Sequence, residues 1–403
     1  MISYEDAAAS FRQAYGTLPT VFVFAPGRIN LIGEHIDYAG GRVLPVTLEW
    51  GVTAAAAPGR PGRIRVHSDQ FLSLGVVEFD PTAPPPPAFT AFVHALALET
   101  GATGADIAAV SDLPLGRGWS SSAAFAVAVS AALLTAEPGR PRPTALELCQ
   151  MCQRAETTAL GVACGLMDQY AAVFGRYDSA LLFDPLHLSH EYIPLGLHDS
   201  DLVVTDSGQP RRLAESGYNE RRAELANAFE ELRRLVGDFA SFRDVEPERL
   251  LDAIQQLPLK LARRVRHVVT EDQRVLQFVK LLREGEVVEM GMLLTAAHDS
   301  LSDDYEVSTP ELDALCRELD AQAGVYGTRL VGGGFGGSVL SLAHKNAVPA
   351  HIERALRSYN KKTHLVAAYD VVIPGSGAQV LLDVAGEPQP LAQWLAGNGR
   401  ETA

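Results

Sequence analysis

The sequence predicts two domains of mixed strands and helices, and three features lead to this expectation. A length of 403 residues is typical of two or three domains at about 150 residues each, and 47% hydrophobic residues are enough to form their cores. Strand-like and helix-like segments alternate along the whole chain. A strand expected at 202–206 precedes a helix-rich stretch to about residue 323, after which strands return. We therefore divide the chain into domains 1–200 and 201–403.

Individual elements are predicted from composition and from turn and capping residues. Strands are expected at 21–25, 42–48 and 52–57 in the first domain, and at 337–342 and 367–374 in the second. Helices are expected at 120–134, 144–160, 167–174 and 218–236. Gly40 and Gly41 mark a turn, and Thr144 with Glu147 forms a capping box at the start of a helix.

Composition and charge restrict the compartment and the partners. No apolar run approaches the roughly 18 residues of a membrane helix, and residues 1–11 carry acids where a signal peptide would carry Lys or Arg. The four cysteines are too few for a disulfide scaffold, so we expect a cytoplasmic protein without a membrane partner. A net charge of −15 repels nucleic acid, which we do not expect as a partner. Any phosphate site must therefore be built from local donors.

Glycines and serines between residues 116 and 124 form a first candidate phosphate site. Gly116 and Gly118 allow a tight turn, and Ser120, Ser121 and Ser122 lie where a helix begins. Free amides and the positive end of the helix dipole would then converge on one spot. No Lys follows the last glycine, so this is not a Walker A loop. The alternative is an ordinary loop before a serine-capped helix.

A second glycine-rich segment, at 332–337, has the letter pattern of a dinucleotide-binding fingerprint. We reject a dehydrogenase, because residues 338–342 look like a strand where that fingerprint needs a helix, and no suitable acid follows about 20 residues later. The segment is either a turn between strands or a backbone that passes close to a ligand.

Five polar residues gather between two predicted strands, in the segment 25–41. Arg28, Asn30, Glu34, His35 and Asp37 offer both donors and acceptors, as recognition of a polyhydroxylated ligand requires. The Glu-His pair is not a zinc site, since no second His lies four residues away. A charged surface loop is the alternative.

Helical geometry places one acid of this chain on an apolar face. Ala145, Cys149, Cys152 and Glu156 share one side of the predicted helix 144–160. The two cysteines are expected in the core. A buried carboxylate needs a partner, and Mg²⁺ with the Ser122 hydroxyl as a second oxygen ligand would supply one. An Arg partner is the alternative.

A second acid, Asp168, lies in the first turn of the predicted helix 167–174 and off its apolar face. The helix dipole favours the ionised form there, which suits a carboxylate in a cleft. An acid that only stabilises a helix start is the alternative.

These segments together resemble the galactokinase branch of the GHMP kinase superfamily, which also contains homoserine, mevalonate and phosphomevalonate kinases. Residues 28–44 are similar to the galactokinase signature, 114–124 to the superfamily's phosphate loop and 329–338 to its third motif. Weaker similarity extends to 266–271, 300–308 and 310–313. The resemblance implies a two-lobed α+β fold with mixed sheets and helices, and an active site in the cleft between the lobes.

The resemblance also implies a reaction, which is transfer of the γ-phosphoryl group of ATP to the anomeric hydroxyl of galactose. Asp168 and Arg28 would face that hydroxyl, and Ser122 and Glu156 would bind Mg²⁺. The other sugar hydroxyls would contact Glu34, His35, Asp37, the backbone of Gly165 and Tyr218. The ATP phosphates would lie against Gly116, Gly118, Ser120, Ser121 and Ser122.

Three positions depart from the family pattern. Ile36 replaces a usual threonine and also occurs in similar N-acetylgalactosamine kinases, Trp119 replaces a leucine in the phosphate loop, and Ser338 replaces a common cysteine. A kinase for another sugar, such as N-acetylgalactosamine or arabinose, is therefore an alternative. A non-catalytic sugar and ATP sensor is another, although such sensors characteristically lack residues of the run 120–124, which is intact in this chain.

Overall fold

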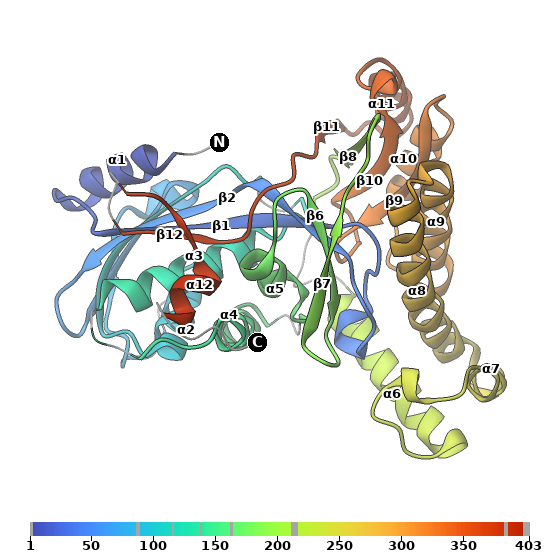
Figure 1. Cartoon of the computed structure of the whole chain (residues 1–403), viewed down its shortest axis with the longest axis horizontal. Helices are drawn as coiled ribbons and strands as arrows, with labels where there is room; N and C mark the ends of the chain where they lie inside the picture. The colour runs from blue at the N-terminus through green and yellow to red at the C-terminus, as the bar shows by residue number, and fades with distance from the viewer. Residues whose placement is uncertain are drawn as a thin grey trace.

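The computed structural model describes residues 3–85, 89–114, 117–137, 139, 141–161, 164–210, 217–382 and 386–397. Two sheets, each with its own helices, lie side by side along the long axis of the molecule (Figure 1). A two-stranded hairpin of β6 (Ser179–Asp184) and β7 (Ser189–Pro194) lies between them in both ribbon views. The predicted mixture of strands and helices is confirmed.

The first sheet has seven strands in the order β13-β12-β1-β2-β5-β3-β4. All neighbours are antiparallel except β3 and β5. The strands are β1 (Val21–Asn30), β2 (Pro45–Pro58), β3 (Arg63–Ser68), β4 (Val77–Phe79), β5 (Gly104–Ser111), β12 (Gln379–Leu381) and β13 (Gln389–Pro390). The last two strands of the chain thus return to pair with β1. The domain boundary near residue 200 stays a prediction. The pairing of β12 with β1 shows in addition that the end of the chain crosses back to the first sheet.

Helices cover both faces of this sheet. Successive side chains of a strand point to opposite faces, and apolar side chains on both faces must be buried. Phe22 packs with Phe11 of α1 (Tyr4–Tyr15), whereas its neighbour Val23 belongs to the main core on the opposite face. The main-core face carries α2 (Phe89–Thr100), α3 (Ser121–Ala136), α4 (Ala145–Leu160), α5 (Met167–Phe174) and α12 (Leu391–Ala396). Figure 1 shows this layering, with α1 above the strands and α2, α4 and α12 below them.

The second sheet is fully antiparallel, in the order β11-β8-β10-β9. Its strands are β8 (Ser200–Asp206), β9 (Val325–Val331), β10 (Ser338–His344) and β11 (Ala368–Val371). The helices are α6 (Tyr218–Val236), α7 (Pro247–Gln256), α8 (Leu259–Glu284), α9 (Val287–Asp299), α10 (Pro310–Asp320) and α11 (Ala350–Thr363). A π-helical turn, η4 (Ser300–Asp304), follows α9, and 3-10 turns lie at η1 (Asp37–Ala39), η2 (Asp69–Leu74), η3 (Phe242–Asp244) and η5 (Lys345–Ala347).

Most predicted elements agree with the structure. The helices predicted at 167–174 and 218–236 match α5 and α6, and the capping box of Thr144 and Glu147 forms at the start of α4. The two strands predicted at 42–48 and 52–57 are wrong as separate elements, because β2 runs unbroken from Pro45 to Pro58. Residues 48–50 of β2 lie opposite the single residue Gly27 of β1, so the extra residues of this register shift bulge out of β2 without ending the strand.

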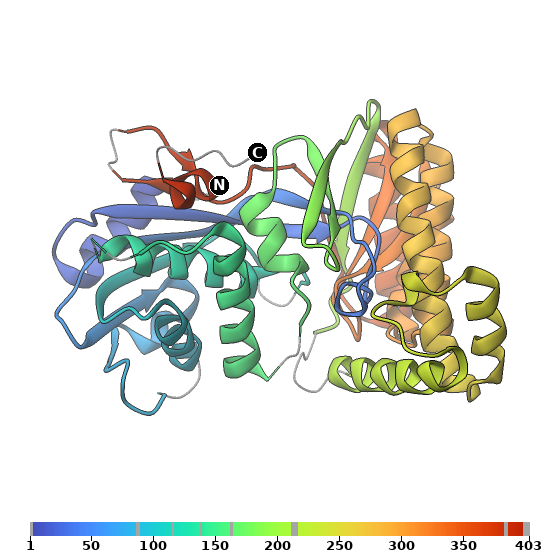
Figure 2. The ribbon, with the colours of Figure 1, turned by 60° about the horizontal axis from the view of Figure 1, so that its bottom comes forward.

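The segment after β1 joins the two halves of the molecule. In both ribbon views this blue segment lies beside α6 and the β6–β7 hairpin (Figures 1 and 2). Arg329 of β9 has a completely buried side chain and donates to the carbonyl oxygens of Leu31 and Asn30 at the end of β1. The polar segment found in the sequence is therefore packed between the two sheets.

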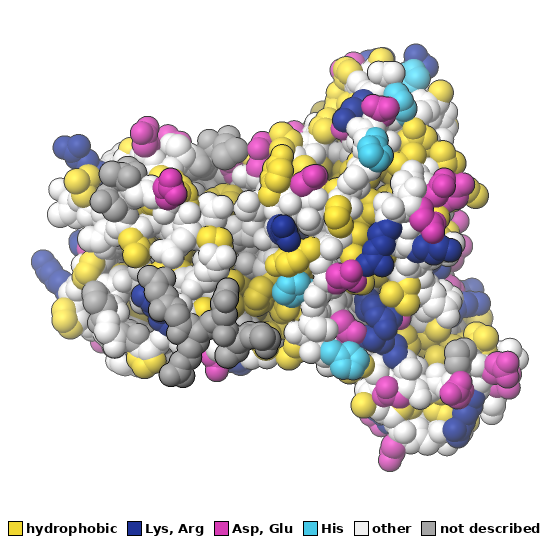
Figure 3. Space-filling model, in the orientation of Figure 1, with side chains coloured by type: hydrophobic (Ala, Val, Ile, Leu, Met, Phe, Trp, Pro, Cys, Tyr) yellow, Lys and Arg dark blue, Asp and Glu magenta, His cyan; other side chains and the backbone are white. Residues whose placement is uncertain are grey.

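The surface carries charges of both signs. On the face in Figure 3, Lys and Arg side chains are interspersed with Asp and Glu, mostly over the half that contains the second sheet. Among the described residues, no helix is long and apolar enough to cross a bilayer.

Candidate active site

The carboxylate of Asp168 is the centre of the candidate site. Arg28 donates to Asp168 Oδ1 from Nε at 2.9 Å and from Nη2 at 2.7 Å, and the Ser120 hydroxyl donates to Oδ2 at 2.5 Å. Arg28 comes from β1, Ser120 directly precedes α3 and Asp168 lies in the first turn of α5, so three elements converge on one carboxylate. The Asp168 side chain remains 28% exposed, so a substrate hydroxyl can still approach it.

The phosphate loop is held against β1 by backbone contacts. The Arg28 amide donates to the Trp119 carbonyl oxygen at 3.1 Å, and Arg28 Nη1 donates to the Gly118 carbonyl oxygen at 2.8 Å. A Cβ atom at Gly27 would lie 2.7 Å from the Trp119 carbonyl oxygen, so this close approach requires glycine. The Trp119 ring is buried and stacks on Trp50 of β2, with centroids 5.4 Å apart.

Ser120 has a left-handed backbone conformation, with φ 57° and ψ 40°. This conformation is rare outside glycine and costs about 1–3 kcal/mol, so it persists only where the surroundings impose it. The Ser120 side chain makes no capping hydrogen bond to α3 and donates to Asp168 instead. The alternative interpretation of Ser120 as a helix cap is therefore wrong.

The remaining residues of the predicted phosphate site are only partly defined. Ser121 and Ser122 are half-buried in the first turn of α3, where the first amides have no partner within the helix. Gly118 lies beside Arg28, whereas Gly116 falls outside the described residues. Contact of this loop with ATP phosphates stays a prediction.

Glu156 lies on the buried face of α4, as its helical spacing predicted, with 8% of its surface exposed. The Ser122 hydroxyl donates to Glu156 Oε1 at 2.6 Å, and Gln169 Nε2 donates to Oε2 at 2.6 Å. Burial raises the pKa of Glu156 to about 7. Cys149 and Cys152, on the same face, are buried free thiols, as expected for core residues.

The pair of Glu156 and Ser122 has the donor chemistry of a magnesium site. Mg²⁺ prefers oxygen ligands and commonly takes one or two protein oxygens together with substrate phosphates. A carboxylate next to a hydroxyl at the start of a helix meets that requirement. No group of three or more His, Cys, Asp or Glu side chains suited to a metal occurs among the described residues, so a site of this composition would need phosphate oxygens as well.

The sugar side of the site contains a second buried acid. Burial, followed by the negative charge of Asp168, raises the pKa of Asp37 to about 6. A Cβ atom at Gly165 would lie 1.6 Å from Asp37 Oδ2, so the absence of a side chain at Gly165 lets the carboxylate reach this position. Asp37, Gly165 and Asp168 are thus brought together from segments more than a hundred residues apart.

Aromatic rings line the neighbouring part of the site. His35 lies with its ring centroid 5.1 Å from that of Tyr218, which begins α6. His35 also has a left-handed backbone, with φ 63°, which turns its side chain relative to the flanking residues. His35 and Tyr218, which were both predicted to bind sugar, are therefore neighbours.

Glu34 lies at the junction between the two sheets. Its Oε1 accepts from the Gly332 amide at 2.7 Å and from Arg329 Nη2 at 3.3 Å, and its Oε2 accepts from Asn30 Nδ2 at 3.0 Å. Both carboxylate oxygens are thus engaged within the protein, and contact of Glu34 with sugar stays a prediction. Gly332 opens the glycine-rich segment 332–337, and the strand β10 follows it where a dinucleotide fingerprint needs a helix, so the rejection of that fingerprint is confirmed.

Sequence reasoning missed several residues of this region. Gln169 bonds Glu156, Arg329 bonds Glu34, and the hydroxyls of Tyr38 and Tyr305 lie 2.7 Å apart beside His35. Gln169 follows Asp168 directly, and Tyr38 lies within the polar segment, so both could have been suspected. Arg329 and Tyr305 lie in the segments 329–338 and 300–308 that resemble the family, but their contacts could not be predicted, because their partners lie hundreds of residues away.

Three family models match this chain. One, described as the galactokinase galactose-binding signature, matches residues 9–58. Models of the GHMP kinase N-terminal and C-terminal domains match residues 88–176 and 278–362.

Known relatives extend the similarity over nearly the full length. A galactokinase from Roseiflexus sp. is 37% identical over 395 residues, which span 96% of this chain and 99% of that protein. A Bacillus subtilis galactokinase is 36% identical, over 94% of this chain and 99% of its own. The chain belongs to the galactokinase family. The crystal structure of Lactococcus lactis galactokinase complexed with galactose agrees, with a TM-score of 0.86, 33% identity and coverage of 93% and 99%.

Membership of the galactokinase family confirms the expected GHMP kinase fold, with its N-terminal and C-terminal domains. It also identifies the chain as an ATP-dependent sugar kinase. In the run 120–122, which is intact in sequence, Ser120 donates to Asp168 and Ser122 donates to Glu156.

Proposed function

We propose that this member of the galactokinase family transfers the γ-phosphoryl group of ATP to the anomeric hydroxyl of galactose, giving galactose 1-phosphate and ADP. The observation that carries the proposal is the Asp168 carboxylate, held by Arg28 of the sugar signature and by Ser120 of the phosphate loop. One carboxylate thereby lies where the segments for the two substrates meet. Relatives named galactokinase, one of them solved with galactose, favour galactose over N-acetylgalactosamine or arabinose.

In the proposed mechanism, Asp168 orients the anomeric hydroxyl and accepts its proton as the oxygen attacks the γ-phosphorus. The bond from the γ-phosphorus to the bridging oxygen breaks, and ADP leaves. Phosphoryl transfer passes through a loose transition state, so catalysis depends chiefly on position and on charge neutralisation. Arg28 fixes the Asp168 carboxylate with two donors, which is a strong geometric constraint.

The phosphates would lie at the start of α3. Its first amides and its dipole favour negative charge there, with the backbones of Gly118, Ser121 and Ser122 nearest to it. Ser122 and Glu156 would hold Mg²⁺, which neutralises phosphate charge when bound. Gln169 orients the Glu156 carboxylate from the opposite side.

The sugar would lie against Asp37, the Gly165 backbone, His35 and Tyr218. Asp37 can accept hydrogen bonds from sugar hydroxyls, and the aromatic rings give an apolar wall for the carbon face of the ring. Ile36 is completely buried, and a Cβ atom at Gly41 would lie 2.8 Å from it. The Ile36 side chain therefore packs directly against the backbone at Gly41, within the signature segment.

We also propose a cytoplasmic location. All four cysteines of the chain are free, and three of them, Cys149, Cys152 and Cys316, are buried, as suits a reducing compartment.

A coupled ADP-release assay with ATP and Mg²⁺ tests the function. The sugars are galactose, N-acetylgalactosamine, arabinose and glucose, with mevalonate and homoserine as further acceptors and Asp168→Ala as the control variant. We expect the fastest turnover on galactose and its loss in the variant. Faster turnover on another sugar would move the assignment to that sugar, and stabilisation by galactose and ATP without any ADP would identify a sensor.

A further inference from the structure

Tyr305 contributes a hydroxyl to the sugar side of the site from the second half of the chain. Its side chain is completely buried, and its ring lies 5.0 Å from that of His35 and 4.6 Å from that of His267. The Tyr305 hydroxyl lies 2.7 Å from the Tyr38 hydroxyl, which lies 3.0 Å from His35 Nδ1. A chain of hydrogen bonds therefore runs from Tyr305 through Tyr38 to His35.

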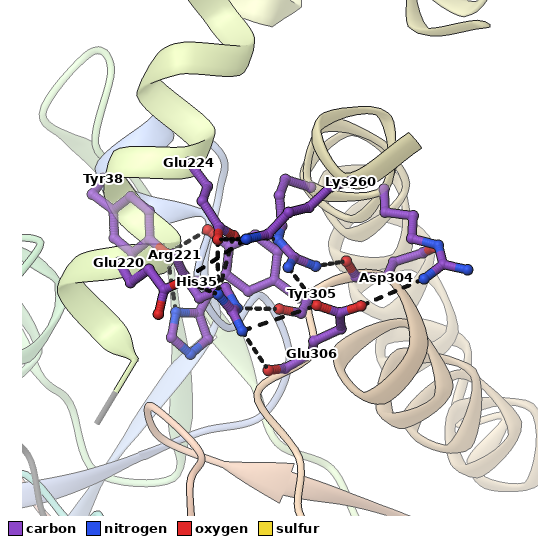
Figure 4. Close-up of polar contacts among 11 residues, drawn as sticks. His35, Tyr38, Glu220, Arg221, Glu224, Lys260, Asp304, Tyr305 and Glu306 are labelled. Carbon is purple, nitrogen blue, oxygen red and sulfur yellow. Dashed lines mark hydrogen bonds and ion pairs between the residues drawn. The ribbon is translucent and has the colours of Figure 1, made fainter. Parts of the chain in front are cut away.

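The backbone that carries Tyr305 is fixed on both sides. Tyr305 directly follows the π-helical turn η4, and its amide donates to the Ser300 carbonyl oxygen at 2.9 Å. Arg221 Nε donates to the Tyr305 carbonyl oxygen at 2.9 Å, and the buried Arg264 bonds Asp304 and Glu306 on either side (Figure 4). Such turns are frequent at functional sites, and here the turn places one hydroxyl with little freedom.

The π-helical turn is also linked, through His267, to the backbone next to His35. His267 Nε2 lies 3.0 Å from the carbonyl oxygen of Glu34, and Nδ1 lies 2.9 Å from the Ser300 hydroxyl. Burial lowers the pKa of His267 to about 4, so this imidazole is neutral near pH 7. It donates to the Glu34 carbonyl and accepts from Ser300, which ties the signature segment to the π-helical turn.

The direction of the hydrogen-bond chain follows from proton counting. A phenol carries one proton, so either Tyr305 donates to Tyr38 or Tyr38 donates to Tyr305. Among the described residues the Tyr305 hydroxyl has only Tyr38 as a hydrogen-bond partner, so its buried proton is satisfied only when Tyr305 is the donor. Tyr38 then donates its own proton to His35 Nδ1. The His35 proton must accordingly reside on Nε2.

We propose that Tyr305 is a positioning residue of the sugar site, whose hydroxyl acts through Tyr38 to fix the tautomer and ring orientation of His35. This inference rests on the proposed function, in which sugar binds beside His35. A fixed Nε2–H is a donor in a defined direction, which suits recognition of a sugar oxygen. Burial raises the pKa of Tyr38 well above its usual range, so the chain keeps its protons throughout the physiological pH range.

The variant Tyr305→Phe tests this role, because it keeps the ring and removes only the hydroxyl. We expect the galactose KM to rise roughly threefold to tenfold, as loss of one net hydrogen bond implies, while the ATP KM changes by less than about twofold. Tyr38→Phe interrupts the same chain from the other side and should raise the galactose KM at least as much.

The matched control is Tyr15→Phe. The Tyr15 hydroxyl donates to the Ile107 carbonyl oxygen at 2.6 Å, on α1 and away from the sugar side, so this variant also loses one hydroxyl bond. Its galactose KM should equal that of the unaltered protein. If Tyr305→Phe behaves like the control, or if it raises the galactose and ATP KM values equally, Tyr305 does not position the sugar site.

Nitrogen NMR of the protein labelled at histidine gives a readout that packing alone would not change. The His35 signals, assigned with His35→Gln, should show the proton on Nε2 in the unaltered protein, and Tyr38→Phe, which removes the donor to Nδ1, should give the largest shift of protonation toward Nδ1. Tyr305→Phe removes the donor that polarises the Tyr38 hydroxyl, so relative to the unaltered protein it should give a smaller shift in the same direction. Identical tautomer signals in both proteins would overturn the proposal. This measurement needs no turnover, so it decides the role of Tyr305 even if galactose proves not to be the substrate.

Discussion

The phosphate side and the sugar side of this site are built in different ways. Ser122 and Glu156 of the phosphate side, with Asp168 at its edge, come from the consecutive helices α3, α4 and α5, which pack against one another on one side of the first sheet. On the sugar side, His35 follows β1, Tyr218 begins α6 and Tyr305 follows the π-helical turn. The phosphate side is therefore formed by helices that are close together in the sequence. The sugar side depends on packing between the two halves of the molecule. Changes on the second side should therefore affect stability and sugar binding together.

The largest effect is expected at Asp168, where the two sides meet. Asp168→Asn keeps the shape but removes the charge that faces Arg28 and the capacity to accept a proton. We expect kcat to fall by about a thousandfold or more, with the ATP KM within about twofold of the original value. Steady-state kinetics with galactose and ATP varied in turn measure both. An unchanged kcat would remove Asp168 from the mechanism.

The next effect concerns the junction at Glu34, and it is one of stability. Glu34→Gln leaves the completely buried Arg329 without its carboxylate partner, which should cost about 3 kcal/mol in the free energy of unfolding. Denaturant unfolding measures it. The matched control is Glu353→Gln, which removes an exposed pair with Arg357 and should change the free energy by less than about 0.5 kcal/mol. Equal changes in both variants would mean that the Glu34 junction does not hold the halves together.

A smaller effect is expected at Gly165, which tests whether the sugar side needs Asp37 in its present place. In Gly165→Ala the new Cβ atom would overlap the Asp37 carboxylate, so Asp37 must move. The galactose KM should rise about tenfold or more, a change worth about 1.4 kcal/mol in binding free energy. In an Asp37→Ala background, Gly165→Ala should add little, because the overlapping group is gone. Additive effects of the two changes would show that Gly165 acts elsewhere.

The mildest prediction concerns pH on the phosphate side. With the pKa of Glu156 raised to about 7, its carboxyl is increasingly protonated as the pH falls through that value. Mg²⁺ binds only the ionised form, so its apparent affinity should fall about tenfold between pH 8 and pH 6. Protonation of ATP also changes Mg²⁺ binding, but it does so equally in the unaltered protein and in Glu156→Gln. The ratio of the two apparent Mg²⁺ affinities at each pH therefore reports on Glu156 alone. A ratio that does not vary with pH would exclude Glu156 as the ligand.

The same comparison explains what the sequence could predict. The helices α4, α5 and α6 and the burial of Glu156 follow from capping residues and helical spacing, which are local. The sequence placed His35 and Asp37 in a polar ligand-binding segment for the same reason. These predictions needed no knowledge of which distant segments pack together.

Other features could not be predicted, because they are created by long-range packing. The return of β12 to β1, the partner of Glu34 on β9 and the hydroxyl of Tyr305 beside Tyr38 all join residues far apart in the chain. The unbroken β2 was missed because composition cannot show that residues 48–50 bulge opposite Gly27 of β1 without ending the strand. Ser120 was described as a helix start, but its left-handed backbone turns its hydroxyl toward Asp168.

The most direct test of the central claim is to identify the product formed from ATP and galactose. Phosphorus NMR of the reaction mixture should show ADP together with a sugar phosphate whose phosphorus couples to the proton on carbon 1, and Asp168→Asn should form neither product at a comparable rate. Phosphate on another carbon, or ADP accompanied only by inorganic phosphate, would contradict the placement of the anomeric hydroxyl at Asp168.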